Sequence, residues 1–281
     1  MEKWEEFYTS KLIDKIHEIE MENLNQLIKV CKNLDISFVL YGGSLLGAYK
    51  YKGFIPWDDD IDVALLRDDY EKLIRKGNAY LSKGFFIESP FNNKKLPYCY
   101  AKLRNQNSKL IEYANKDIDM HKGIYIDIYP IDNIPDNDSL YKKQFSRVRK
   151  FIKLYAWRQS WRLSCKPQNS KEYIKQFCKY FVSLLLKVLP SKFYMTKINQ
   201  AMTMYNQVKT QRTSCLVSPN IDNFYNPLLP FRTIFFENKQ MYAPQDLTGH
   251  LTRRYGNITE LPPEEKRYGH IPYKVEVNDG Y

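Results

Sequence analysis

One stretch, YGGSLLGAYKYKGFIPWDDDIDV at residues 41–63, constrains what this chain can fold into more than any other part of the sequence. It follows an apolar run that suits a buried strand. Its two glycines, Gly42 and Gly43, permit a tight turn and let a ligand approach the backbone closely. A helix that begins at Ser44 would direct its free N–H groups toward an anion. These three residues therefore form the predicted phosphate-binding segment.

Three carboxylates in the second half of this stretch, Asp58, Asp60 and Asp62, predict a metal site. Alternate residues of a strand share a face, so the three would lie on one side, about 6.7 Å apart. Each adjacent pair would cost about 2.5 kcal/mol at an effective dielectric of about 20, a cost that folding does not require. A solvated acidic loop is the plainer interpretation, but Ile61 and Val63 suit burial of the opposite face. Hard oxygen ligands of this kind favour Mg²⁺, with Mn²⁺ as the alternative.

The segment GGSLLGAYKYKGFIPWDDDIDVALLRDDYEKL closely resembles the signature of the LicD family, within the nucleotidyltransferase-fold superfamily that also includes fukutin-related protein. The resemblance reappears at YAKLRNQNS (residues 100–108), GIYIDIYPIDNIP (123–135) and LTRRYGNITELPPEEKRYGH (251–270). Four blocks in the family's order argue against chance similarity. The resemblance implies an α/β (α+β) chain with a nucleotidyltransferase-fold core and a small mixed sheet.

A further carboxylate, Asp127, lies in a predicted strand at residues 123–130, where isoleucines share the other face. A lone aspartate in this setting is expensive to bury without a partner. The resemblance implies that Asp127 is the third metal ligand, or the base that accepts the proton of the attacking hydroxyl, and that it is catalytic together with Asp60 and Asp62. Asp132 is the weaker alternative, since an aspartate in a turn commonly caps its own backbone.

Basic side chains are the candidates for contacts with the donor phosphates. Lys102 and Arg104 alternate in a predicted strand and could point to one side, although an exposed strand face would look the same. The resemblance favours a role in neutralising the pyrophosphate. His270, with Arg267, could return to the site from the C-terminal block, whose plainer interpretation is a rigid surface loop.

The net charge of +11 belongs to one segment of the chain. Residues 141–200 contain 15 basic residues and one acidic residue, Glu172, which gives +14 and leaves the rest of the chain at −3. The pattern there is helical, and Trp157 and Trp161 are one turn apart. A solvated helical face is one interpretation, and a surface for anionic lipid or an anionic glycan is another. No recognised nucleic-acid-binding signature accompanies the basic residues.

The remaining features predict a cytoplasmic protein, peripheral on the inner face of the membrane if the basic segment binds lipid. We identify no secretory signal and no apolar run of about 18 residues. The five cysteines lie singly along the sequence, without C-x-x-C spacing. We expect a catalytic core at residues 1–138, a basic helical region at 139–215 facing acceptor or membrane, and a segment at 216–281 that returns to the core.

The resemblance implies Mg²⁺-dependent transfer of a phospho-alcohol, most often phosphocholine from CDP-choline, to a hydroxyl of a cell-surface glycan precursor such as teichoic acid, lipopolysaccharide or capsule, with release of CMP. Donors carrying glycerol or ribitol, and a nucleotidyltransferase that uses a nucleoside triphosphate, are the alternatives within the enzymes. Outside them, the alternative is a membrane-associated scaffold that binds glycan. Choline would need an aromatic cage for its quaternary ammonium. The sequence has 23 tyrosines, too many to assign the cage to particular residues.

Overall fold

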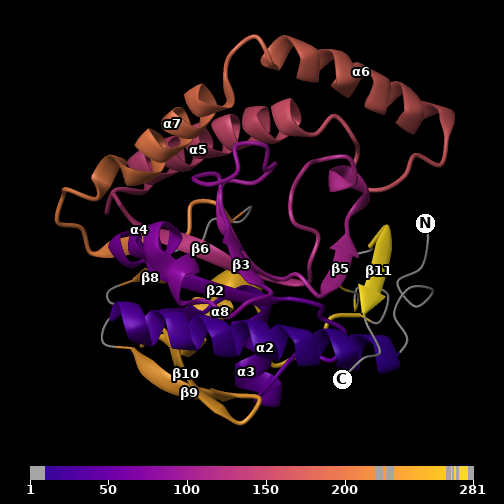
Figure 1. Ribbon diagram of the computed structural model, residues 1–281. Helices are drawn as coiled ribbons and strands as arrows, with labels where there is room; N and C mark the ends of the chain where they lie inside the picture. The colour runs from indigo at the N-terminus through magenta and orange to yellow at the C-terminus, as the bar shows by residue number, and fades with distance from the viewer. Residues whose placement is uncertain are drawn as a thin grey trace.

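The computed structural model describes residues 10–218, 224–225, 231–263, 267, 269 and 272–277 of the chain (Figure 1). Its helices are α2 (Ser10–Leu34), α3 (Gly42–Tyr51), α4 (Arg67–Lys76), α5 (Asp138–Gln159), α6 (Ser170–Leu186), α7 (Ser191–Met202) and α8 (Leu247–Tyr255). Its strands are β1 (Val39–Leu40), β2 (Ile61–Leu66), β3 (Phe85–Glu88), β4 (Ala101–Asn105), β5 (Ser108–Ile111), β6 (Tyr125–Ile134), β7 (Arg212–Ser214), β8 (Phe224–Tyr225), β9 (Arg232–Phe236), β10 (Lys239–Ala243) and β11 (Lys274–Val277).

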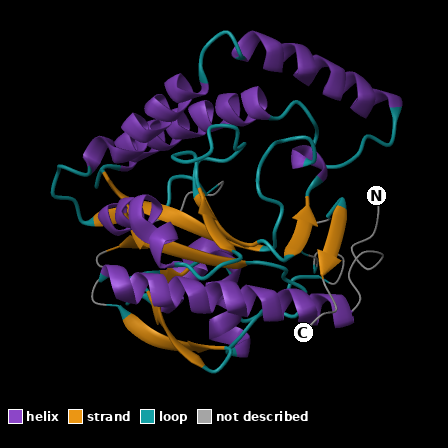
Figure 2. Ribbon diagram, in the orientation of Figure 1, coloured by secondary structure: helices purple, strands orange, loops and turns teal. Residues whose placement is uncertain are grey.

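A mixed sheet lies at the centre of the molecule, with strand order β1-β2-β6-β4-β3 and β7 attached to β6. Strands β2 and β6 pair in parallel, and the other pairs are antiparallel. Figure 2 shows this sheet between two groups of helices, with α5, α6 and α7 on one side and α2 and α3 on the other. The α/β class with a small mixed sheet is therefore confirmed.

The two faces of the sheet bury different side chains. Val63 and Leu65 of β2 lie in the core that contains α2, whereas Ala64 lies in the core that contains α5 and α7. Successive side chains of a strand point to opposite faces, so Asp62 shares the face of Ala64. Its partner in the parallel β2–β6 pair is Asp127. Both carboxylates therefore lie on the side of the sheet that faces the basic helices.

Helices α5, α6 and α7 occupy the basic region, as its sequence pattern predicts. The proposed divisions of the chain after residues 138 and 215 stay predictions. Throughout the described ranges, no helix has both the length and the apolar character that crossing a bilayer would require.

Candidate active site

Three carboxylates from separate parts of the chain meet at one edge of the central sheet. Asp60, Asp62 and Asp127 each place a carboxylate oxygen within 4.8 Å of the other two. Asp62 and Asp127 are register partners on the parallel strands β2 and β6. Asp60 comes from the turn that precedes β2. The fold thus brings together the three aspartates that were predicted to be catalytic.

The prediction of one strand carrying Asp58, Asp60 and Asp62 is wrong in its local structure. Strand β2 begins only at Ile61. Of the three aspartates, only Asp62 therefore lies on a strand. The other two lie in the turn that follows α3, where Asp58, Asp59 and Asp60 form a second group of carboxylates within 4.8 Å. Asp59 is buried and was not among the predicted site residues. Its position inside the DDDID run was the available signal.

The two glycines make room for the protein's own carboxylates. Gly42 has a left-handed backbone with φ +53°, and a Cβ atom there would lie 2.1 Å from Asp62 Oδ2. A Cβ atom on Gly43 would lie 2.3 Å from Asp58 Oδ2. Helix α3 therefore begins two residues earlier than expected, at Gly42, with its N-terminus against the aspartates. Glycine was predicted here because a ligand would approach the backbone closely. In the structure the groups that approach the backbone are the carboxylates of Asp62 and Asp58.

Ser44 ties helix α3 to strand β2. Its hydroxyl is buried and accepts a hydrogen bond of 2.8 Å from the backbone N–H of Asp62. This contact holds the first residues of β2 against the helix N-terminus. The structure therefore gives Ser44 a positioning contact, and its role in binding phosphate stays a prediction.

Asp127 is held from three directions. The ammonium group of Lys102 lies 2.8 Å from Asp127 Oδ1, and both side chains are almost fully buried. The hydroxyls of Tyr100 and Tyr129 donate to Asp127 Oδ2 over 3.2 and 3.0 Å. Burial, and secondarily the charge of Asp127, raises the pKa of both tyrosines well above the usual value, so they remain neutral donors. Lys102 is thereby placed at the carboxylate cluster.

Arg104 lies two residues further along β4 and is engaged elsewhere. Its guanidinium pairs with Glu88 at 3.4 Å and donates to the Gly123 carbonyl at 2.7 Å. The side chain is almost completely buried, and these contacts direct its guanidinium to Glu88 and Gly123 instead of to the carboxylate cluster. His270, the remaining predicted substrate contact, lies outside the described residues.

A buried glutamate beneath the cluster was missed, because the sequence pattern of α2 indicated packing alone. Glu20 is fully buried, and neither carboxylate oxygen accepts a hydrogen bond from the described residues. Burial raises the pKa of Glu20 well above the usual value, and the charges of Asp60 and its neighbours add to the shift. One turn earlier, the His17 ring contacts the Asp58 carbonyl over 2.8 Å. Helix α2 therefore forms one wall of the acidic site.

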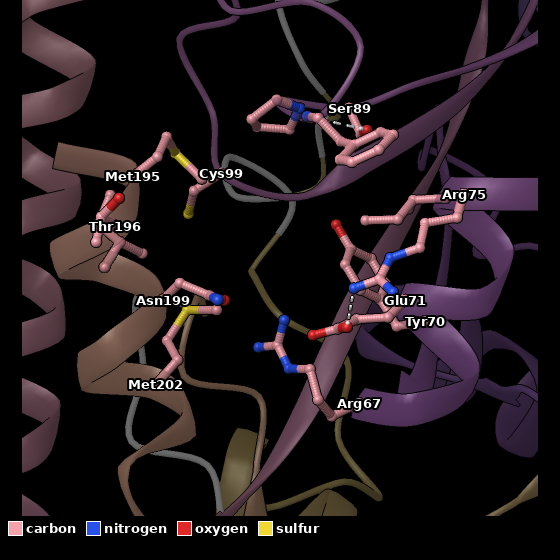
Figure 3. Close-up of a pocket in the computed structure, with 14 residues that line it drawn as sticks. Arg67, Tyr70, Glu71, Arg75, Ser89, Cys99, Met195, Thr196, Asn199 and Met202 are labelled. Atoms are coloured by element: carbon pink, nitrogen blue, oxygen red, sulfur yellow. Dashed lines mark hydrogen bonds and ion pairs between the residues drawn. The ribbon is translucent and has the colours of Figure 1, made fainter. Parts of the chain in front are cut away.

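Asp132, the weaker candidate for the third ligand, belongs to a different site. It lies in β6, which continues past the expected end of the strand, and it forms a bidentate pair with Arg67 at 2.7 and 2.5 Å. Asn206 donates to the same carboxylate. Arg67 lines the pocket between α4 and α7 shown in Figure 3, which lies at the opposite end of β2 from Asp62. This pocket is therefore separate from the carboxylate cluster.

The donor set of the cluster fits a hard divalent cation. Three carboxylates supply oxygen ligands at mutual distances that one ion can span, and Asp58 lies beside them. Asp62 and Asp58 approach the two glycines closely, so their negative charges lie against the N-terminus of helix α3. The helix dipole offsets only part of the repulsion between these charges.

Comparison with known proteins agrees with this geometry. Residues 35–155 match the family model described as LicD/FKTN/FKRP, nucleotidyltransferase domain. The matched segment contains α3, β2, β4 and β6, and hence every aspartate of the cluster. The description of that model assigns the segment to a nucleotidyltransferase domain. The match agrees with the LicD resemblance of the sequence motifs.

Two curated relatives extend the match. The chain is 28% identical over 257 residues to a protein of Haemophilus influenzae described as lipopolysaccharide cholinephosphotransferase LicD, and the alignment covers 86% of this chain and 89% of the relative. It is 26% identical over 141 residues to an uncharacterized protein of Rickettsia typhi, covering 49% of this chain and 41% of that protein. The first similarity includes the basic helices as well as the domain.

Proposed function

We propose that this protein is a phosphotransferase of the LicD type that moves phosphocholine from CDP-choline to a hydroxyl of a lipopolysaccharide-type glycan, with release of CMP. The family match and the description of the Haemophilus influenzae relative support the class of reaction. The observation that carries the proposal is the meeting of Asp60, Asp62 and Asp127 beside Lys102.

In this proposal Asp60, Asp62 and Asp127 hold Mg²⁺ or Mn²⁺, with Asp58 assisting from the turn. The ion would neutralise negative charge on the donor pyrophosphate while the acceptor hydroxyl attacks the distal phosphorus. Lys102 supplies a fixed positive charge at the same place, buried where its electrostatic effect is strong. Tyr100 and Tyr129 orient Asp127 by donating to one of its oxygens.

The tyrosines around Lys102 do not provide the choline cage. The Lys102 ammonium lies 3.2 Å from the Tyr125 ring centroid, 5.2 Å from that of Tyr98 and 5.7 Å from that of Tyr100. The chain's own cation therefore fills this aromatic cluster. A quaternary ammonium would have to be bound by other residues, and we assign none.

Titration calorimetry and product analysis with Mg²⁺ test the proposal. We expect CDP-choline to bind more tightly than CTP or ATP, and CMP to be released when lipopolysaccharide-type acceptor is added. Stronger binding of CDP-glycerol or CDP-ribitol would change the alcohol and keep the reaction. Release of pyrophosphate from CTP would identify a nucleotidyltransferase, and glycan binding without turnover of any donor would leave a scaffold.

A matched pair of variants shows whether the cluster is responsible. Asp60→Asn should abolish donor turnover, whereas Asp68→Asn, at an exposed position on α4, should leave it unchanged. Equal turnover in both variants would contradict the assignment of the cluster as the active site.

A further inference from the structure

Helix α6 presents a continuous apolar face to the surroundings. Ile174, Phe177, Leu185 and Val188 are 63%, 62%, 72% and 82% exposed, and Phe181 is exposed beside them. These positions recur at the spacing of one helix face and of the turn that follows it. Figure 1 shows α6 at the outer edge of the helical layer, farther from the central sheet than α5. Large exposed apolar patches of this kind mark interaction surfaces.

The opposite face of α6 packs against the protein mainly through polar side chains, with Leu186 at its end against the core that contains α5 and α7. Gln176 and Ser183 are its buried residues, and they hydrogen-bond to the Leu163 N–H at 3.2 Å and to the Arg158 carbonyl at 3.4 Å. Lys179 donates to the Arg162 carbonyl. A surface helix normally buries its apolar face and exposes its polar one. Here the order is reversed, so packing within the chain does not account for the apolar face.

The charges around α6 favour one kind of partner. Lys171, Lys175, Lys187 and Lys192 are all exposed on or next to the helix, and Glu172 is the one acidic residue of the sequence between 141 and 200. A second copy of this chain would bring the same lysines together, which costs free energy. Anionic lipid headgroups would pair with the lysines while the apolar side chains enter the acyl boundary.

We propose that α6 is a membrane-docking helix that lies in the plane of an anionic bilayer, with the face defined by Ile174, Phe177, Phe181, Leu185 and Val188 toward the acyl chains. The proposal does not depend on the donor that the active site uses. The sequence of the basic region allowed either a solvated helical face or a surface for anionic lipid or glycan. A docking helix at α6 favours the lipid surface.

Vesicle co-sedimentation of the full chain tests this docking. We expect binding to phosphatidylcholine vesicles that contain phosphatidylglycerol, weaker binding to pure phosphatidylcholine, and a further loss at high salt. Ile174→Gln, Phe177→Gln and Leu185→Gln together should lower the vesicle partition coefficient by at least about tenfold. The matched control, Phe91→Gln with Phe235→Gln, removes side chains that are 64% and 58% exposed elsewhere and should bind like the unmodified protein.

A second measurement separates lipid insertion from other causes. Cys165 and Cys178 are exposed and the other three cysteines are buried, so an environment-sensitive fluorophore can be attached to Cys178 on α6 in a Cys165→Ser background. Its emission should shift to the blue on addition of anionic vesicles. Unchanged emission together with vesicle binding that ignores the triple substitution would overturn the proposal. So would a concentration-dependent dimer that the triple substitution abolishes, if vesicles fail to bind.

Discussion

Asp60, Asp62 and Asp127 lie so close together that their carboxylates repel one another in the metal-free fold. At about 5 Å and an effective dielectric of about 20, one pair repels by about 3 kcal/mol before screening. We expect Asp60→Asn or Asp62→Asn to raise metal-free stability by about 1–2 kcal/mol, since water and salt screen part of the repulsion. The same variants should lose the stabilisation that Mg²⁺ gives. Thermal unfolding with and without MgCl₂ checks both effects, and Mg²⁺ stabilisation that survives both substitutions would remove the metal from the mechanism.

Glu20 predicts an unusual pH dependence of stability. Its pKa is raised in the fold, so the folded chain keeps a proton that the unfolded chain loses above its ordinary value near 4.5. Stability from this group is therefore present below pH 4.5 and is lost as the pH rises toward the raised pKa, by up to about 1.4 kcal/mol per pH unit.

Glu20→Gln should flatten that dependence and raise metal-free stability at neutral pH. Urea unfolding at several pH values provides the measurement. Glu18→Gln is the matched control, because Glu18 lies on the same helix and is exposed. If the slopes for the unmodified protein and the Glu20 variant coincide, Glu20 does not hold its proton in the fold.

At the scale of elements, the junction between β1 and α3 determines where the carboxylates lie. Gly42→Ala would strain the left-handed backbone at φ +53° and place a methyl group against Asp62. We expect a loss of well over about 1 kcal/mol of stability, and a loss of Mg²⁺ affinity even without a nucleotide donor.

Gly256 offers a control for the backbone strain alone. Its φ is +73°, and a Cβ atom there would meet nothing within 4 Å. Its ψ is −120°, so the strain of Gly256→Ala should cost about 1–3 kcal/mol and leave Mg²⁺ affinity unchanged. Calorimetric titration with MgCl₂ compares the two variants. Equal Mg²⁺ affinities in the two variants would show that Gly42 is needed only for its backbone conformation and not for the position of Asp62.

Element boundaries at the site were harder to predict than the elements themselves. The Asp-x-Asp alternation suggested a strand from residue 58, but the turn persists to Asp60 and the strand begins at Ile61. The alternation of aspartates looks the same in a strand and in a loop, so the pattern alone does not show where the strand begins. Similarly, Lys102 and Arg104 alternate along β4, yet only tertiary packing decides that one meets Asp127 and the other Glu88.

At the scale of the whole molecule, local patterns predicted the helical basic region and the pair Asp60 and Asp62, whereas the family resemblance implied the small mixed sheet and the role of Asp127. They did not reveal Glu20, whose position against the cluster depends on how α2 crosses the sheet. They also did not reveal the reversed packing of α6, because an amphipathic pattern shows two faces without showing which one the protein covers. Both features depend on docking between elements distant in the sequence.

The parallel pairing of β2 with β6 makes metal affinity a reporter of folding. Asp62 and Asp127 are opposite each other only in the native register, and a slip of one residue would bring Ile126 or Ile128 beside Asp62 and turn Asp127 to the other face. A refolding chain would therefore complete the site formed by Asp60, Asp62 and Asp127 only after this long-range pair has formed correctly. The onset of ion binding during refolding would time the closure of the sheet separately from the helical signal, which α5, α6 and α7 can contribute earlier from local contacts.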